Sequence, residues 1–408
     1  MTEEFDPVKF LTEIVRIPSE SGYQGSVITR KNYREVTDII EKTALDLGLN
    51  VQRVDLLNGE IPTLLISLSK APKNLPTLAF ATHYDVVPAK GPWEIDGVKI
   101  DPYEPLVRNG KVYGRGAADD KSAIAAVLAG LAALKGQEEK LRYQPILIVT
   151  GDEEVGGVGV RALLEQGYRW DRVVIVDSGS EYVSIGASGV VHGWIKVKGR
   201  SGHAGYPHTT RNAVEDLLKL LGEMQGYKAL RNSKVSKLPS PPGSPIPRVW
   251  GRFSITVVKL PEHEPEKHNR IPGEAWAGFD IRLLPEEKLE EALAELYGYF
   301  SSAVAKLGIN ASLDIISGQP GWFAKNDLFV NEVLNAAKKA YKEVGFRGEP
   351  QLVAELGGND GTFFDMFGMD VVAFGTIREG TNIHSEGEFV YIDDILMFKH
   401  FMVEMLRR

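Results

Sequence analysis

The chain has 408 residues, enough for two or three domains of about 150 residues each, and its lack of cysteine excludes disulfides and thiolate metal sites. A formal net charge of −8 argues against a nucleic-acid partner or an acidic membrane surface, and a hydrophobic content of 43% is ordinary for a globular protein. The acidic start is no signal peptide and no apolar run reaches the roughly 18 residues that span a bilayer, so we expect a cytoplasmic protein.

The first part of the chain alternates predicted helices with predicted strands. Apolar residues at helical spacing predict a helix over 29–49 and a second, alanine-rich helix after Asp119. Short apolar runs predict buried strands at 77–82, 144–150 and 172–176. This alternation is typical of a largely parallel sheet with crossover helices, so we predict an α/β fold.

The pattern changes near Ser188. Residues 190–197 alternate like an antiparallel strand, and two more strands and two helices follow them. From about residue 312 the alternation of helices and strands returns. We therefore predict one α/β domain built from residues 1–187 and 312–408, with a separate α+β domain inserted at 188–311.

Residues 113–121 read Tyr-Gly-Arg-Gly-Ala-Ala-Asp-Asp-Lys and open the alanine-rich helix. The glycines permit a tight loop, and Asp119 or Asp120 could cap the helix through a side-chain oxygen. A loop and a helix cap would be enough to explain this stretch by itself. Acidic residues and histidines at other predicted strand ends favour a second interpretation.

Three candidate metal ligands follow predicted buried strands, namely His83, Glu154 and Asp177. In open α/β sheets, ligands bind outside the carboxyl ends of the strands, where these side chains would converge. Asp119 and His384 come from loops. Two histidines and three carboxylates exceed the about four ligands of one zinc ion, but they fit two ions if one carboxylate bridges. We therefore predict a two-metal site with Asp119 between the ions.

Each of these residues also has a simpler interpretation. His83 could be a buried histidine that is hydrogen-bonded to Asp85, and Asp177 could cap a strand end. Glu153 and Glu154 could form a solvated acidic turn. Their joint placement at strand ends is what favours the metal site.

Four stretches carry a resemblance to a known family: His-Tyr-Asp-Val-Val-Pro from His83, Gly-Arg-Gly-Ala-Ala-Asp-Asp-Lys from Gly114, Gly-Asp-Glu-Glu-Val-Gly-Gly from Gly151 and Val-Asp-Ser-Gly from Val176. In this order they resemble the metallopeptidase family that includes succinyl-diaminopimelate desuccinylase, acetylornithine deacetylase, aminoacylase and glutamate carboxypeptidase. The resemblance covers nearly the whole chain. It implies a zinc-exopeptidase-like α/β/α catalytic domain with an inserted, ferredoxin-like lid and dimerisation domain.

The resemblance also implies roles for single residues. Glu153 would be the general base, Asp85 would hold the second nitrogen of His83, and the Asp119–Asp120 peptide bond would be cis. Cobalt or manganese could replace zinc at nitrogen and oxygen ligands. The implied ligand set is His83 and Asp177 on one zinc ion, Glu154 and His384 on the other, and Asp119 on both.

The inserted domain carries weaker matches to the same family. Gly-His-Ala-Gly around His203 resembles a lid motif whose histidine stabilises the oxyanion in the partner subunit. Asn269 and Arg282 lie in stretches that resemble substrate-carboxylate motifs, although they could also be a turn residue and a surface charge. The stretch around Gly358 only approximates the family's glycine-rich substrate loop, which weakens any transfer of substrate identity.

Together these observations predict a homodimeric di-zinc hydrolase that cleaves an amide next to a free carboxylate in an N-acyl amino acid or short peptide. The nearest alternative is a carboxypeptidase or dipeptidase. An alternative of another class is a catalytically inactive relative that binds a peptide, which intact Glu153 and the five ligands disfavour. A two-metal phosphoesterase is weaker still, because no glycine loop suited to phosphate opens a helix in the right context.

Overall fold

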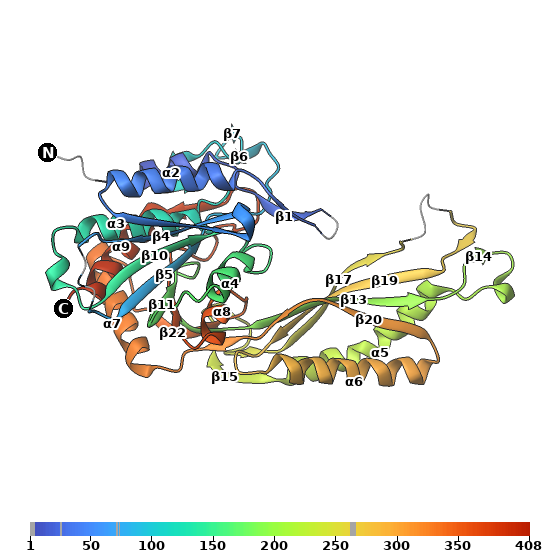
Figure 1. The fold of residues 1–408 in the computed structure, drawn as a ribbon. Coiled ribbons are helices and arrows are strands. Elements are labelled where there is room, and N and C mark those ends of the chain that lie inside the picture. The colour runs from blue at the N-terminus through green and yellow to red at the C-terminus, as the bar shows by residue number, and fades with distance from the viewer. Residues whose placement is uncertain (1–4, 25–26, 71, 73, 262–266) are drawn as a thin grey trace. The chain divides into compact units, whose positions relative to one another are not determined.

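The computed structural model describes residues 5–24, 27–70, 72, 74–261 and 267–408, and it divides the chain into two compact units (Figure 1). Unit 1 comprises Met1–Ile185, Ala324–Val353 and Asn359–Arg408. Unit 2 comprises Gly186–Phe323 and Ala354–Gly358, so it is inserted into unit 1. None of the described helices is long and apolar enough to cross a membrane.

The sheet of unit 1 has parallel strands at its centre. β5 (Thr77–His83) lies between β10 (Gln144–Thr150) and β11 (Arg172–Ile175), and β23 (Asp370–Ala373) pairs with the far side of β11. On one side, β4 pairs antiparallel with β10 and β3 pairs antiparallel with β4. On the other side, β12 pairs antiparallel with β23, and β22 pairs with β12. These outer strands are β4 (Ile61–Ser67), β3 (Asn50–Leu56), β12 (Tyr182–Ala187) and β22 (Gln351–Glu355).

Helices cover both faces of this sheet, which makes unit 1 a three-layer α/β/α structure. Because side chains alternate along a strand, Leu78 and Phe80 of β5 face one helix layer while Ala79 and Ala81 face the other. Figure 1 shows α4 (Val158–Glu165) and α8 (Gly361–Met366) on this second face. The first layer consists of α1 (Pro7–Val15), α2 (Tyr33–Asp46), α3 (Lys121–Leu134), α7 (Asp327–Val344) and α9 (Ile392–Leu406).

The helix α3 is buried along most of its length because small residues let it approach its neighbours closely. At Gly130 an added Cβ would lie only 2.3 Å from the sulfur of Met402 on α9. This packing fixes the start of α3, and with it the loop that carries Asp119.

Unit 2 is a ferredoxin-like fold. Its sheet is antiparallel throughout and has the order β17–β19–β13–β20, while the chain order is β13, α5, β17, β19, α6, β20. The helices α5 (Ala213–Ser233) and α6 (Leu289–Leu307) bury one face of the sheet. The strands are β13 (Gly189–Lys198), β17 (Arg252–Lys259), β19 (Glu274–Leu283) and β20 (Asn310–Gln319).

The end of the inserted unit differs from the expected boundary at residue 311. That position falls inside β20, and unit 2 continues to Phe323. β20 is an edge strand in which Ala311, Leu313 and Ile315 alternate with exposed polar residues, but the alternation ends at the exposed Ile316, so the apolar signal is short. Residues 354–358 also belong to unit 2, although they come after the chain has returned to unit 1.

Candidate metal centre

The predicted ligands of unit 1 meet at one edge of its sheet. His83 is the last residue of β5, Glu154 follows β10 and Asp177 follows β11. Thr150 of β10 pairs with His83 in register, so neighbouring parallel strands end together. Asp119 lies just before α3, and its peptide bond to Asp120 is cis, as the family resemblance implies.

The carboxylate of Asp119 lies between two histidines. Its Oδ1 is 3.1 Å from Nε2 of His83, and its Oδ2 is 3.0 Å from Nε2 of His384, in the loop between β23 and β24 (Phe389–Tyr391). Oδ2 of Asp177 is 3.8 Å from Nε2 of His83, and Oε2 of Glu154 is 3.0 Å from Nε2 of His384. Each histidine therefore has a carboxylate of its own, and both share Asp119.

The potential donor atoms form two groups whose members lie within 4.8 Å of one another. Nitrogen and oxygen donors without thiolate suit zinc, and also cobalt or manganese. Glu153 is a member of one group, so geometry alone permits it to be either a ligand or a base. The groups are Asp119, Glu154 and His384, and His83, Glu153 and Asp177.

The electrostatics of the cluster also fit a cation site. Burial, together with the negative charge of Asp119, raises the pKa of Glu154 and of Asp177 to about 7 each. Hydrogen bonds to Asp119 and Glu154 raise the pKa of His384 to about 10. Burial would raise the pKa of Asp119, but hydrogen bonds from His384 and His83 lower it. Crowded buried carboxylates need positive charge nearby, which divalent ions at these donors would provide.

Asp85 connects His83 to the turn that carries Glu153 and Glu154. Its carboxylate accepts hydrogen bonds from the backbone N–H groups of Glu153 at 3.2 Å and Glu154 at 3.3 Å, and from the Ser21 hydroxyl at 2.7 Å. Nδ1 of His83 lies 3.4 Å from this carboxylate and 3.0 Å from the backbone carbonyl of Asp85. The predicted contact is therefore present, but the Asp85 carbonyl is the nearer acceptor. The hydrogen bonds that Glu153 and Glu154 donate to Asp85 were not predicted.

Two further acidic residues near the cluster were missed by sequence reasoning. Burial raises the pKa of Asp360 to about 7. The positive charge of His83 opposes this increase, and the negative charge of Asp177 adds to it. Glu388 is fully buried and accepts hydrogen bonds from the backbone of Ala118 at 3.1 Å and of Asp119 at 3.2 Å. Asp360 lies two residues after Gly358 and Glu388 lies four residues after His384, so each is close in sequence to a residue that had been assigned a role.

The remaining predicted site residues belong to unit 2. His203, on β14 (Gly202–His203), is exposed and its Nδ1 accepts a hydrogen bond from the N–H of Gly205 at 3.0 Å. β14 pairs with β18 (Arg270–Ile271), and the carbonyl of Asn269 accepts from the N–H of Ala204 at 2.8 Å. Unit 2 thus places Asn269, just before β18, close to His203 on the neighbouring strand β14, whereas Arg282 lies on β19.

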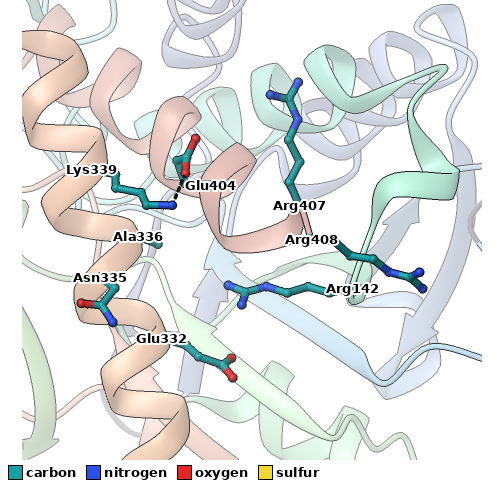
Figure 2. Close-up of a pocket in the computed structure, with 8 residues that line it drawn as sticks. All are labelled: Arg142, Glu332, Asn335, Ala336, Lys339, Glu404, Arg407 and Arg408. Atoms are coloured by element: carbon teal, nitrogen blue, oxygen red, sulfur yellow. Dashed lines mark hydrogen bonds and ion pairs between the residues drawn. The ribbon is translucent and has the colours of Figure 1, made fainter.

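A separate cavity of about 340 Å³ in unit 1 is lined by none of the predicted site residues. Figure 2 shows it beside α7 and the end of α9, where Lys339 and Glu404 form an ion pair at 2.9 Å. A second lining carboxylate, Glu332, pairs with Arg172 at 2.8 Å. Both carboxylates that line the cavity are therefore already paired with a basic side chain.

A histidine and carboxylate cluster at the ends of parallel strands, within an α/β/α unit that carries a ferredoxin-like insertion, defines a metal-dependent amidohydrolase. The chain belongs to peptidase family M20/M25/M40, whose model matches residues 79–408. The family resemblance of the four sequence stretches is thus confirmed.

Two named relatives match most of the length of the chain. Succinyl-diaminopimelate desuccinylase of Caulobacter vibrioides is 28% identical over 423 residues, which cover 99% of this chain and 96% of that protein. The desuccinylase of Alkalilimnicola ehrlichii is 29% identical, with 89% of this chain and 90% of that protein covered.

Solved structures share the fold at lower identity. An M20 family metallo-carboxypeptidase from Sulfolobus solfataricus has a TM-score of 0.78 at 18% identity, with 98% of each chain covered. Human carnosine dipeptidase 1 has a TM-score of 0.72 at 23% identity, over 98% of this chain and 96% of that one. A dinuclear metal-binding peptidase from Bacillus subtilis has a TM-score of 0.64 at 15% identity, over 98% and 96%.

Proposed function

We propose that the protein is a di-zinc deacylase that hydrolyses the amide bond of N-acyl amino acids. The observation that carries this proposal is the Asp119 carboxylate, whose two oxygens face His83 and His384 separately. Asp119 would bind both ions, and the desuccinylase relatives support a deacylase. His83 and Asp177 would complete one set of ligands, and Glu154 and His384 the other.

The chain itself would supply the base and its orientation. Bound divalent ions supply a Lewis acid for the amide carbonyl and favour ionisation of water. Glu153 takes a proton from the attacking water and delivers it to the leaving nitrogen. This role is supported by the position of its carboxylate beside His83 and Asp177. Asp85 holds the backbone of Glu153 and so fixes where this carboxylate points.

Unit 2 would act as a lid and dimerisation domain in a cytoplasmic homodimer. Arg282 and Asn269 would bind the free carboxylate of the substrate, since an arginine fork matches a carboxylate. The loop at Gly358 would let the substrate approach closely. His203 would donate a hydrogen bond to the developing oxyanion in the active site of the partner subunit.

A carboxypeptidase or dipeptidase is the nearest alternative, and the fold shared with a metallo-carboxypeptidase and a carnosine dipeptidase favours it. An inactive peptide-binding relative is the alternative of another class. Glu153 beside a full donor set argues against inactivity, because a relative that only binds has no need of the base.

A substrate screen separates these possibilities. The protein would be purified without chelator, its metal content measured, and zinc, cobalt or manganese added before assay with N-succinyl amino acids, N-acetyl amino acids and dipeptides. We expect close to two ions per chain and fastest turnover of an N-acyl amino acid. Faster turnover of dipeptides would establish the alternative enzyme, and binding without any turnover would establish the inactive relative.

A further inference from the structure

The turn that carries Glu153 and Glu154 begins at a residue with an unusual backbone conformation. Asp152 has a φ of +67°, in the left-handed region that residues with a side chain rarely adopt. Its carbonyl accepts hydrogen bonds from the N–H groups of Gly157 at 2.8 Å and Val158 at 3.3 Å, which closes the turn in front of α4. The conformation of Asp152 therefore sets the direction in which the chain runs into the two glutamates.

Both oxygens of the buried Asp152 carboxylate are held by side chains from earlier in the chain. Arg30 is the last residue of β2 (Val27–Arg30), which pairs with β1 (Ser21–Gln24). Its Nε donates to Oδ1 and Oδ2 of Asp152 at 3.0 and 2.9 Å, and its Nη2 donates to Oδ2 at 2.5 Å. The hydroxyl of Tyr33 donates to Oδ1 at 2.7 Å. The carboxylate is therefore fixed in place by a bidentate arginine and a tyrosine.

The β1–β2 hairpin holds the same turn at two further points. The hydroxyl of Tyr23 donates to the carbonyl of Val155 at 3.0 Å, just after the two glutamates. Ser21 is the direct partner of Arg30 in the hairpin register, and its hydroxyl donates to Asp85, which accepts the N–H groups of both glutamates. The hairpin thus holds the turn directly or through Asp85 before, within and after the glutamate pair, and its contact before the pair is an ion pair.

The two glutamates point to different groups of donor atoms, although they are neighbours in the sequence. The carboxylate of Glu153 lies in the group of His83, and that of Glu154 lies in the group of His384. This division depends on the backbone of the turn, because one backbone conformation has to aim both side chains at once.

We propose that Arg30 and Asp152 are positioning residues for this pair of glutamates. The ion pair holds Asp152 in its left-handed conformation, and the turn then directs Glu153 to the attacking water and Glu154 to the metal ion. Both positioning residues act through the backbone of the turn rather than through a contact with the substrate. The roles of the two glutamates rest on the proposed function, whereas the contacts of the ion pair do not.

Substitutions at the ion pair test this proposal through metal affinity as well as turnover. In Asp152→Ala and Arg30→Gln we expect kcat and the affinity for one of the two ions each to fall about 10- to 100-fold, the usual scale when a group that supports a metal ligand is lost. KM should stay within about twofold, because no substrate contact is removed. Glu60→Gln is the matched control, since Glu60 is exposed and pairs with Nη1 of the same guanidinium at 2.5 Å.

Conservative variants separate positioning from a loss of folding. Asp152→Asn keeps a side-chain oxygen and tolerates the left-handed conformation, and Arg30→Lys keeps the charge but not the bidentate fork, so both should retain part of the metal affinity and of kcat. Chelator competition would measure the affinity without substrate, and urea denaturation of the metal-free variants would measure stability. Wild-type metal affinity in Asp152→Ala, or a rise in KM at constant kcat, would overturn the proposal. Failure of the wild-type protein to hydrolyse N-acyl amino acids would contradict the proposed function alone and leave the affinity comparison intact.

Discussion

Oε1 of Glu388 accepts a hydrogen bond from the backbone N–H of Asp119 at 3.2 Å, although the two residues are 269 positions apart in the sequence. The same oxygen accepts from Ala118, and the other oxygen pairs with the buried guanidinium of Arg115. Glu388 ends the loop that carries His384. The buried carboxylate of Glu388 therefore links the loop that carries Asp119 to the loop that carries His384.

Replacement of Glu388 should weaken both the fold and the metal site. Glu388→Ala leaves Arg115 buried without a partner, so we expect a loss of about 3–5 kcal/mol in the free energy of unfolding. Urea denaturation of the metal-free protein measures this loss, and chelator competition measures the metal affinity. Glu386→Ala, an exposed change in the same loop, is the control. Metal affinity equal to the wild type in Glu388→Ala would show that the Asp119 loop holds its position without this contact.

Variants of the adjacent residues Glu153 and Glu154 should differ in the number of metal ions that they bind. Glu153→Gln should lower kcat by at least about 100-fold, the scale of a lost general base, while both ions stay bound. Glu154→Gln should lose one ion, because Glu154 is a proposed ligand that lies against His384. Metal analysis of the purified variants together with turnover distinguishes the two roles. Loss of an ion from Glu153→Gln would make Glu153 a ligand instead.

The proposed role of His203 in the partner subunit can be tested by mixing inactive variants. His203→Ala and Glu153→Ala homodimers should each be nearly inactive. Subunit exchange should restore about a quarter of the wild-type activity, because half of the dimers are mixed and each mixed dimer has one intact composite site. Activity would be measured after mixed dimers are verified by differently tagged subunits. Mixed dimers without activity would assign His203 to its own subunit or to no chemistry.

Unit 2 should lose stability in acid through Glu287. This carboxylate accepts hydrogen bonds from Arg231 at 2.6 and 2.7 Å and from Lys234 at 2.9 Å. Burial opposes its ionisation, but the bonds from Arg231 and Lys234 lower its pKa from 4.5 to about 2. Because the pKa is lower in the folded state, the stabilisation is complete above about pH 4.5 and is lost as the pH falls towards 2.

Glu287→Gln should remove this pH dependence, at a cost of about 1–2 kcal/mol at neutral pH after allowance for solvent screening of a partly exposed cluster. Denaturant titrations between pH 2 and about pH 7 would measure it. Glu290→Gln, an exposed change on α6, is the control. The same acid dependence in Glu287→Gln and in the wild type would mean that other carboxylates dominate.

The central strands and the edge where the candidate ligands meet could be predicted because both depend on local sequence. A parallel strand that is buried on both faces reads as a continuous apolar run, and the residue after it lies at the carboxyl edge. β10 was predicted with the bounds it has, and β5 differs by one residue at its end. The placement of His83 and Asp177 at this edge could therefore be predicted from the sequence.

Contacts between distant segments could not be predicted in this way. Glu388 accepts a hydrogen bond from Asp119, and Asp85 accepts one from Glu153, and both bonds join loops whose approach depends on the whole sheet. β20 was missed as the last strand of unit 2 because its alternation of apolar and polar residues ends at Ile315 and the rest of this edge strand is mostly exposed. The position of Arg252 on β17 opposite Arg282 on β19 likewise depends on the register of two strands, which neither strand's sequence determines alone.

The position of β23 between β11 and β12 has a consequence for synthesis on the ribosome. Chains emerge N-terminus first, and domains generally fold as units. Most of unit 2 emerges before β23 and His384, so it can fold while the sheet of unit 1 still has an open edge at β11. Any chain released before the segment that contains His384 would lack both the strand that closes this edge and one member of the donor cluster. Such a truncated product would present an unpaired strand to its neighbours, which is a route to aggregation.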